Sequence, residues 1–148
     1  MIILDFEAHK EAKEKLTEEC ARLWVSQEDT TFWFHFATCM YHYVGETITT
    51  NKQNIDDYKI LENYHTKFLM LYQSHQDAEY AGVTLPLTYK HVFLLEKYFT
   101  IFLDICMEEG EHEYVEKCEY YLEYMNKRIQ QEQTVFATIA KRLNRHIH

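Results

Sequence analysis

Residues 28–50 read EDTTFWFHFATCMYHYVGETITT. The large apolar side chains in this stretch, among them Phe32, Trp33, Phe36 and Met40, fall on nearly every side of a helical wheel. A helix that is apolar all round is expected in the middle of a bundle, because each of its faces needs a partner. The stretch therefore predicts a central, buried helix against which the other segments pack.

Turn and cap signals divide the rest of the chain into further helices. Ser26 to Asp29 gives a turn and an N-cap signal before the central helix. Gly82 is the expected stop of the third helix, Pro86 the expected entry to the fourth, and Gly110 its expected end. The sequence predicts helices over about residues 4–25, 28–50, 54–81, 86–109 and 111–145.

Short loops between long helices favour antiparallel neighbours. We therefore expect an all-α fold in which residues 1–148 form a single domain, an antiparallel up-down bundle of four to five helices. A solenoid of helix-pair repeats is the competing architecture, but the sequence shows no second copy of such a repeat. The long C-terminal helix would extend past the core, which makes it a candidate surface for homo-oligomer formation.

Length and composition indicate a globular protein with its own core. A chain of 148 residues, 47% of them hydrophobic, can bury a core without disulfides or a metal. The uncharged stretch 30–45 is too short to span a bilayer, and residues 1–6 do not resemble a signal peptide. The four cysteines show no CxxC spacing, so we expect reduced thiols in a cytoplasmic protein without a membrane segment.

The net charge of −9 is concentrated in one segment. Residues 104–123 hold eight carboxylates against a single base, Lys117, whereas residues 127–148 carry an excess of basic side chains. An acidic domain repels phosphate backbones, which makes nucleic acid an unlikely partner, and the acidic segment suits a basic protein partner instead. The candidate partner-binding residues are Glu108, Glu109, Glu111, Glu113 and Glu116. The alternative is that these acids only form a solvated helix face.

Histidines and one cysteine give a candidate metal site. In a bundle, positions about six residues from the loops at one end are Cys20, His35, His75 and His91, one on each of four helices. Imidazole nitrogen and thiolate sulfur suit zinc or iron. A looser set at the other end comprises His9, His42, Glu46 and His65. The alternative is that these histidines are hydrogen-bonded structural side chains.

The orientation of His35 separates these alternatives. His35 shares a polar stripe with Cys39 and His42, on the opposite side of the helix from Trp33. If the Trp33 face is the core, His35 points to solvent and the metal site loses a ligand.

Two functions follow from these patterns. The sequence favours a non-enzymatic, acidic protein-binding module of the inhibitor, immunity or adaptor type, which needs no cofactor. The alternative is a metal-binding bundle with zinc or iron that performs oxygen, redox or hydrolytic chemistry. Neither a Gly-rich phosphate loop nor a GxSxG elbow occurs, and no catalytic residues are assigned.

Overall fold

The computed structural model describes residues 14–46, 52–73 and 82–132, together with Lys10, 134–135, 137–138 and Lys141. Most of these residues are helical, which confirms the predicted helical character of the chain. In chain order the elements are β1 (Glu19–Ser26), α2 (Gln27–Gly45), α3 (Lys52–Gln73), β2 (Gly82–Thr88), α4 (Tyr89–Glu109) and α5 (His112–Gln131). None of the helices within the described residues is long and apolar enough to cross a membrane.

Strands β1 and β2 form a two-stranded antiparallel sheet, so the all-α prediction is not confirmed. Ala21, Leu23 and Val25 are buried, whereas Arg22 and Trp24 between them are exposed. This alternation has the period of two that is typical of a strand with one buried face. The predicted helix over residues 4–25 is therefore wrong from Glu19 onward, because Cys20 and Leu23 fit a helical stripe and a strand alike.

The predicted helix start at Pro86 is also wrong. Pro86 lies within β2, where it is exposed and paired in register with Arg22. A proline is compatible with this position because both strands of a two-stranded ribbon are edge strands. Helix α4 begins only at Tyr89, after Thr88, whose side chain accepts a hydrogen bond from the backbone N–H of His91.

Apart from the end of α5, the other helix boundaries agree with the prediction where the structure describes them. Helix α4 ends at Gly110, which has a left-handed φ of 71°, as expected for a glycine stop. Helices α2 and α3 cover most of the predicted ranges 28–50 and 54–81, and residues 47–51 and 74–81 lie outside the described part. Helix α5 begins as predicted but ends at Gln131, with Glu132 as its C-cap, so the prediction of one helix up to residue 145 is wrong at this end. Within the predicted range, residues 133, 136, 139–140 and 142–145 lie outside the described part.

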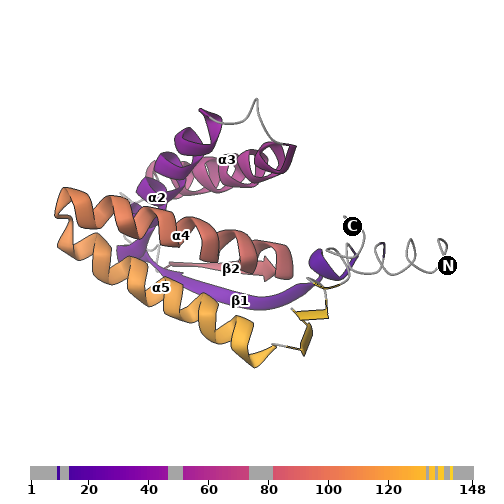
Figure 1. Cartoon of the computed structure of the whole chain (residues 1–148). Coiled ribbons are helices and arrows are strands. Elements are labelled where there is room, and N and C mark those ends of the chain that lie inside the picture. The colour runs from indigo at the N-terminus through magenta and orange to yellow at the C-terminus, as the bar shows by residue number, and fades with distance from the viewer. Residues whose placement is uncertain are drawn as a thin grey trace.

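The helices form two hairpins, α2–α3 and α4–α5, and each hairpin follows one strand (Figure 1). The predicted up-down bundle is not confirmed, since a strand rather than a short loop leads from the first hairpin into the second. Helix α2 is central, as predicted. Its Trp33 ring lies 5.2 Å from Phe68 of α3, 5.2 Å from Phe99 of α4 and 5.1 Å from Tyr121 of α5, measured between centroids.

The two β-α-α units share one burial pattern. Every buried position from Leu23 to Val44 in β1 and α2 has a buried counterpart 62 residues later in β2 and α4. These pairs are Leu23/Leu85, Val25/Leu87, Thr30/Val92, Phe32/Leu94, Trp33/Leu95, Phe36/Tyr98, Ala37/Phe99, Met40/Phe102 and Val44/Cys106. Helices α3 and α5 correspond at a separation of 57, which pairs the buried Leu61, Tyr64 and Phe68 with the buried Cys118, Tyr121 and Met125. The buried Asp57 of α3 differs, since its counterpart Tyr114 is only half-buried.

Strand pairing agrees with this repeat. Leu23 and Leu85 are equivalent positions of the two units, and they face each other directly across the sheet. Such pairing is expected when two copies of one unit are related by a two-fold axis through the ribbon. The fold is therefore an internal repeat of a strand followed by a helical hairpin.

Candidate functional site

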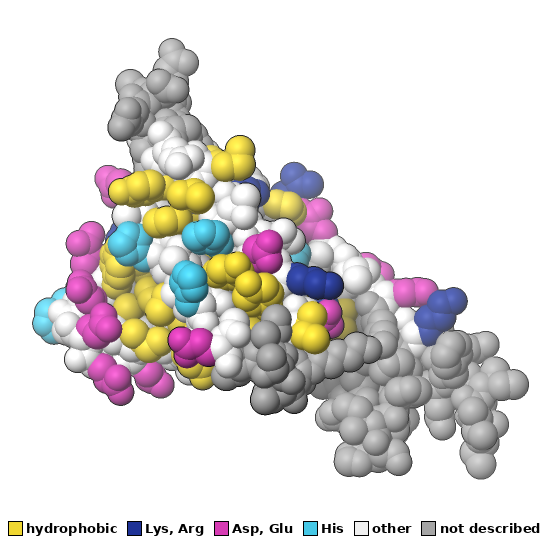
Figure 2. Space-filling view, turned by 90° about the horizontal axis from the view of Figure 1, so that it is seen from above, with side chains coloured by type: hydrophobic (Ala, Val, Ile, Leu, Met, Phe, Trp, Pro, Cys, Tyr) yellow, Lys and Arg dark blue, Asp and Glu magenta, His cyan; other side chains and the backbone are white. Residues whose placement is uncertain are grey.

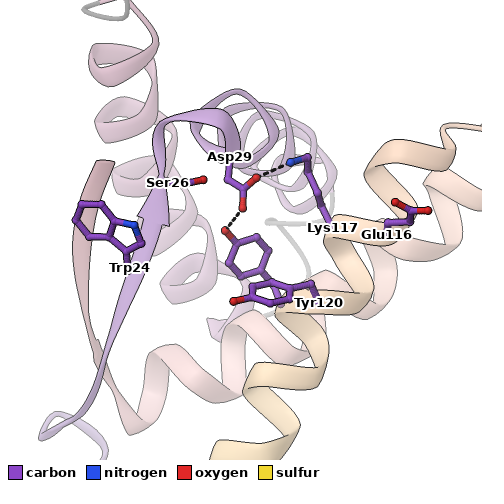
Figure 3. Close-up of a pocket in the computed structure, with 7 residues that line it drawn as sticks. Trp24, Ser26, Asp29, Glu116, Lys117 and Tyr120 are labelled. Atoms are coloured by element: carbon purple, nitrogen blue, oxygen red, sulfur yellow. Dashed lines mark hydrogen bonds and ion pairs between the residues drawn. The ribbon is translucent and has the colours of Figure 1, made fainter. Parts of the chain in front are cut away.

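A surface pocket of about 310 Å³ lies where the end of β1 and the start of α2 meet α5 (Figure 3). Strand β1 brings Trp24, and the β1–α2 junction brings Ser26 and Asp29. Helix α5 contributes the remaining side chains, Glu116, Lys117, Tyr120 and Tyr121. Because β1–α2 belongs to the first repeat unit and α5 to the second, the pocket lies between the two units.

A carboxylate with two partners forms the inner wall of the pocket. Asp29 Oδ1 lies 2.5 Å from Lys117 Nζ, and Asp29 Oδ2 accepts a 2.5 Å hydrogen bond from the Tyr121 hydroxyl. The Asp29 and Lys117 side chains are only 18% and 23% exposed, so this pair is shielded from solvent more than an ordinary surface ion pair. We call Asp29, Lys117 and Tyr121 the Asp29 triad.

The environment keeps both donors of the Asp29 triad protonated at neutral pH. Burial and the hydrogen bond to Asp29 raise the pKa of Tyr121 above the usual tyrosine value. Burial opposes the charge of Lys117, but the hydrogen bond and negative charge of Asp29 outweigh it, and the net pKa of Lys117 is raised. Asp29 therefore faces a cation and a neutral hydroxyl, and its own negative charge is compensated.

The start of α4 in the second repeat unit corresponds to the start of α2, which carries Asp29, but its hydrogen bonds are different. There Thr88 caps α4 and the N3 residue, His91, accepts from the Thr88 N–H, which completes a capping box. Ser26 is the N-cap of α2, but its side chain makes no capping bond. The residue three positions on, Asp29, bonds to α5 instead. The first unit thus uses its N3 carboxylate to join the two units and not to cap its own helix.

Two of the side chains that line the pocket are exposed aromatic rings. Trp24 is 54% exposed and Tyr120 is 63% exposed. In Figure 3 they lie on either side of Ser26 and Asp29, Trp24 on the strand and Tyr120 on the helix. Exposed aromatic side chains next to a pocket are more typical of a binding site than of a core.

Gly82 determines where the Trp24 ring can lie. It has a φ of +149°, and a Cβ built on it would lie 2.4 Å from Cζ2 of Trp24 and 2.7 Å from the Val25 carbonyl oxygen. Any other residue would therefore displace the indole and strain the backbone. Gly82 was expected to end a helix; its role in the structure is to begin β2 and to leave room for Trp24.

The acidic residues singled out in the sequence are all exposed. They extend from the end of α4 through the turn into α5, in the order Glu108, Glu109, Glu111, Glu113 and Glu116. Glu116 is the member of this set that lines the pocket. We call these five residues the acidic surface. The sequence identified it, whereas Trp24, Asp29 and Tyr120 were not predicted as site residues.

The predicted metal ligands are placed in different surroundings. His35 is exposed on α2, and its ring lies 5.6 Å from that of Tyr114. His91 belongs to the α4 capping box, and burial, with the neighbouring Lys90, lowers its pKa. Cys20 is half-buried on β1, and burial and the charge of Glu132 raise the pKa of its thiol. His75 lies outside the described residues.

The prediction of a metal site remains untested at this point. No group of three His, Cys, Asp or Glu side chains suited to a metal occurs among the residues that the structure describes. Because His75 is not among them, the four-residue site proposed from the sequence stays a prediction. Of the looser set, His42 and Glu46 are exposed, and His9 is not described.

His65, the last member of that looser set, has a structural environment. Its ring stacks on Phe34 and Tyr41, at centroid distances of 5.7 and 5.4 Å, and its Nδ1 is hydrogen-bonded to Thr38 Oγ1 at 2.9 Å. These contacts join α3 to α2. Figure 2 shows the molecule from the side of this hairpin, where histidine and hydrophobic side chains gather on the surface. For His65 the structure supports the hydrogen-bonded structural alternative.

Comparisons with protein-family models, with curated proteins and with solved structures gave no match for this chain. Its function therefore has to be inferred from the geometry of the site.

Proposed function

We propose that this protein is a non-enzymatic protein-binding module, of the inhibitor, immunity or adaptor type. Its partner surface consists of the acidic surface and the neighbouring surface pocket between β1 and α5, which we call the Trp24–Tyr120 pocket after its two exposed aromatic side chains. The observation that carries this proposal is their continuity, since Glu116 belongs to both. Charged residues that steer a partner and exposed aromatic residues that anchor it are the two components of many protein interfaces.

The charge of this surface selects the kind of partner. All five carboxylates of the acidic surface are exposed. The one base in the same region, Lys117, is paired with Asp29 and so does not compensate them. A basic protein surface is the partner that complements this field. The four cysteines are free thiols, which agrees with a reducing compartment, and we propose that the protein acts in the cytoplasm.

Affinity capture with matched variants tests the proposal. The full chain serves as bait in a lysate of its source, as wild type and as the triple variant Glu111→Gln/Glu113→Gln/Glu116→Gln. A control triple variant, Glu46→Gln/Asp56→Asn/Glu62→Gln, removes the same charge from exposed positions of the α2–α3 hairpin.

We expect a basic protein to be retained by wild type and by the control but not by the first triple variant. Equal retention by all three baits would show that the acidic surface does not bind the partner. Loss in the control alone would place the interface on the α2–α3 hairpin, against the proposal.

A further inference from the structure

Two tyrosine side chains face each other across the α2–α3 hairpin. The rings of Tyr41, on α2, and Tyr58, on α3, stack with their centroids 4.7 Å apart and their planes 24° from parallel. The Tyr58 hydroxyl donates a 2.7 Å hydrogen bond to the Tyr41 hydroxyl. Because both the ring centres and the hydroxyl oxygens are close, the ring carbons beside the hydroxyls, the Cε atoms, also lie close together.

Neighbouring residues on both helices hold these two rings in place. The His65 ring stacks on Tyr41 at a centroid distance of 5.4 Å, with its plane 6° from parallel, and its Nδ1 is hydrogen-bonded to Thr38. Gly45 leaves room for Tyr58, since a Cβ on Gly45 would lie 3.2 Å from Cε2 of that ring. The two tyrosines are therefore positioned by packing, unlike a pair of freely moving surface side chains.

The internal repeat shows that the fold does not require phenols at these positions. The counterparts of Tyr41 and Tyr58 in the second unit are Leu103 and Val115. Both are half-buried, as the two tyrosines are. Aliphatic side chains therefore occupy the equivalent places on α4 and α5, and the paired hydroxyls belong to the first unit alone.

A second tyrosine pair has a different geometry. Tyr120 and Tyr121 are adjacent on α5, and their ring planes are 85° apart. Tyr121 is buried, and its hydroxyl is bound to Asp29. Tyr41 and Tyr58 are instead nearly parallel, bonded to each other through their hydroxyls, and both still in part exposed to solvent.

We propose that Tyr41 and Tyr58 form an oxidative cross-linking site, at which one-electron oxidants derived from peroxide join the two rings as dityrosine. Each phenol loses one electron and its hydroxyl proton, and the two radicals form a bond between one Cε of each ring. They meet without diffusion, because the rings are already in contact.

The atoms and electrons of this step balance. After coupling, the C–H bond at each joined carbon breaks and its hydrogen moves to the oxygen, which restores both phenols. The two electrons and two protons released reduce one peroxide to two waters. The product fastens α2 to α3 within one chain. The site is separate from the proposed acidic surface, which lies on α4 and α5.

Photochemical oxidation of the full chain tests this inference. A ruthenium tris-bipyridine complex is illuminated with persulfate at low protein concentration, where coupling between molecules is rare. We expect dityrosine fluorescence in the monomer band of a denaturing gel. Trypsin cleaves between the two tyrosines, at Lys52, so the digested band should contain a cross-linked pair of peptides that carry Tyr41 and Tyr58. This pair should be lighter by two hydrogen atoms than the sum of the two peptides.

Two variants give the control. Tyr58→Phe keeps a ring in the stack but removes one phenol, so the cross-link should be lost. Tyr43→Phe removes an exposed tyrosine near Tyr41 on the same helix and should leave the cross-link intact. The peptide pair from the wild-type protein tests the inference even if Tyr58→Phe does not fold.

Three results would overturn the inference. The first is fluorescence confined to bands of dimers and larger species, which would show that the two tyrosines do not couple within one chain. The second is the same cross-linked monomer in Tyr58→Phe. The third is loss of the cross-link in Tyr43→Phe, which would assign the reaction to Tyr43.

Discussion

Tyr121 donates a 2.5 Å hydrogen bond to Asp29, 92 positions away along the chain. The bond joins α5, in the second repeat unit, to the first turn of α2, in the first. A separate bond joins the units elsewhere, since the buried Tyr98 of α4 donates to Asp57 of α3 at 2.6 Å. Tyrosine-to-aspartate bonds between the units are therefore part of how the repeat is assembled.

We predict that Tyr121→Phe lowers the free energy of unfolding by about 1–2 kcal/mol, because a partly buried carboxylate loses a hydrogen bond. Urea denaturation measures the change. Tyr124→Phe is the matched control on the same helix, at a half-buried position, and should cost less than about 0.5 kcal/mol. Equal effects of the two variants would mean that the bond to Asp29 does not stabilise the fold.

The two helix caps should differ in their contribution to stability. Thr88→Ala removes a side chain that accepts from the His91 N–H, and we expect a cost of about 1 kcal/mol. Ser26→Ala removes a hydroxyl that makes no capping bond, and its cost should be a few tenths of a kcal/mol. Thermal denaturation of both variants under one condition checks this. A loss for Ser26→Ala as large as that for Thr88→Ala would contradict the comparison of the two units.

Gly82→Ala should destabilise the protein and move Trp24. The new Cβ would meet the indole and the Val25 carbonyl oxygen, so we expect a cost of about 2–3 kcal/mol and a changed Trp24 indole resonance. Gly110→Ala is the control, because its φ is also positive but the space around it is open. It should cost about 1 kcal/mol and leave the Trp24 resonance unchanged. An unchanged Trp24 resonance in Gly82→Ala would show that Gly82 does not position the ring.

Alkaline pH should unfold the protein cooperatively. Burial raises the pKa of Tyr64, and burial together with an aspartate hydrogen bond raises those of Tyr98 and Tyr121. Above about pH 10 the unfolded chain loses phenolic protons that the folded state retains. The stabilisation is complete below that pH and falls as pH rises toward the folded pKa values.

The absorbance of tyrosinate measures this directly. We expect the exposed tyrosines to titrate first, and the buried Tyr64, Tyr98 and Tyr121 to titrate in a single step that coincides with loss of helical circular dichroism. Titration of every tyrosine in one smooth curve around pH 10, with the helices intact, would show that these hydroxyls are not protected.

The metal prediction has its own test. For protein purified without an affinity tag, our account expects much less than one equivalent of zinc or iron, and no rise in melting temperature when either is added. Near-stoichiometric metal that is lost in His75→Ala would instead support the site predicted from the sequence.

The sequence predicted the helices better than the strands. The apolar stretch around Trp33 marked the central helix, and Gly110 marked the end of α4, because both signals are local. Strand β1 was missed because Leu16, Cys20 and Leu23 also satisfy a helical period over a short stretch. In β2, Gly82 was interpreted as a helix end and Pro86 as a helix start, although both residues are also compatible with an edge strand.

The site could be predicted only in part. The acidic surface is contiguous in sequence, so counting charges found it. The pocket brings Trp24 and Asp29 to Tyr121, and no local pattern connects residues so far apart. The repeat was also hidden, since its two copies share burial but few residue identities, as the pair Trp33 and Leu95 illustrates.

The most direct test of the central claim is the association rate of this protein with its captured partner, measured as a function of ionic strength. If the acidic surface steers a basic partner to the Trp24–Tyr120 pocket, the rate should fall steeply as salt rises, and Glu111→Gln/Glu113→Gln/Glu116→Gln should remove most of that dependence. A rate that does not change with salt in the wild-type protein would contradict the account.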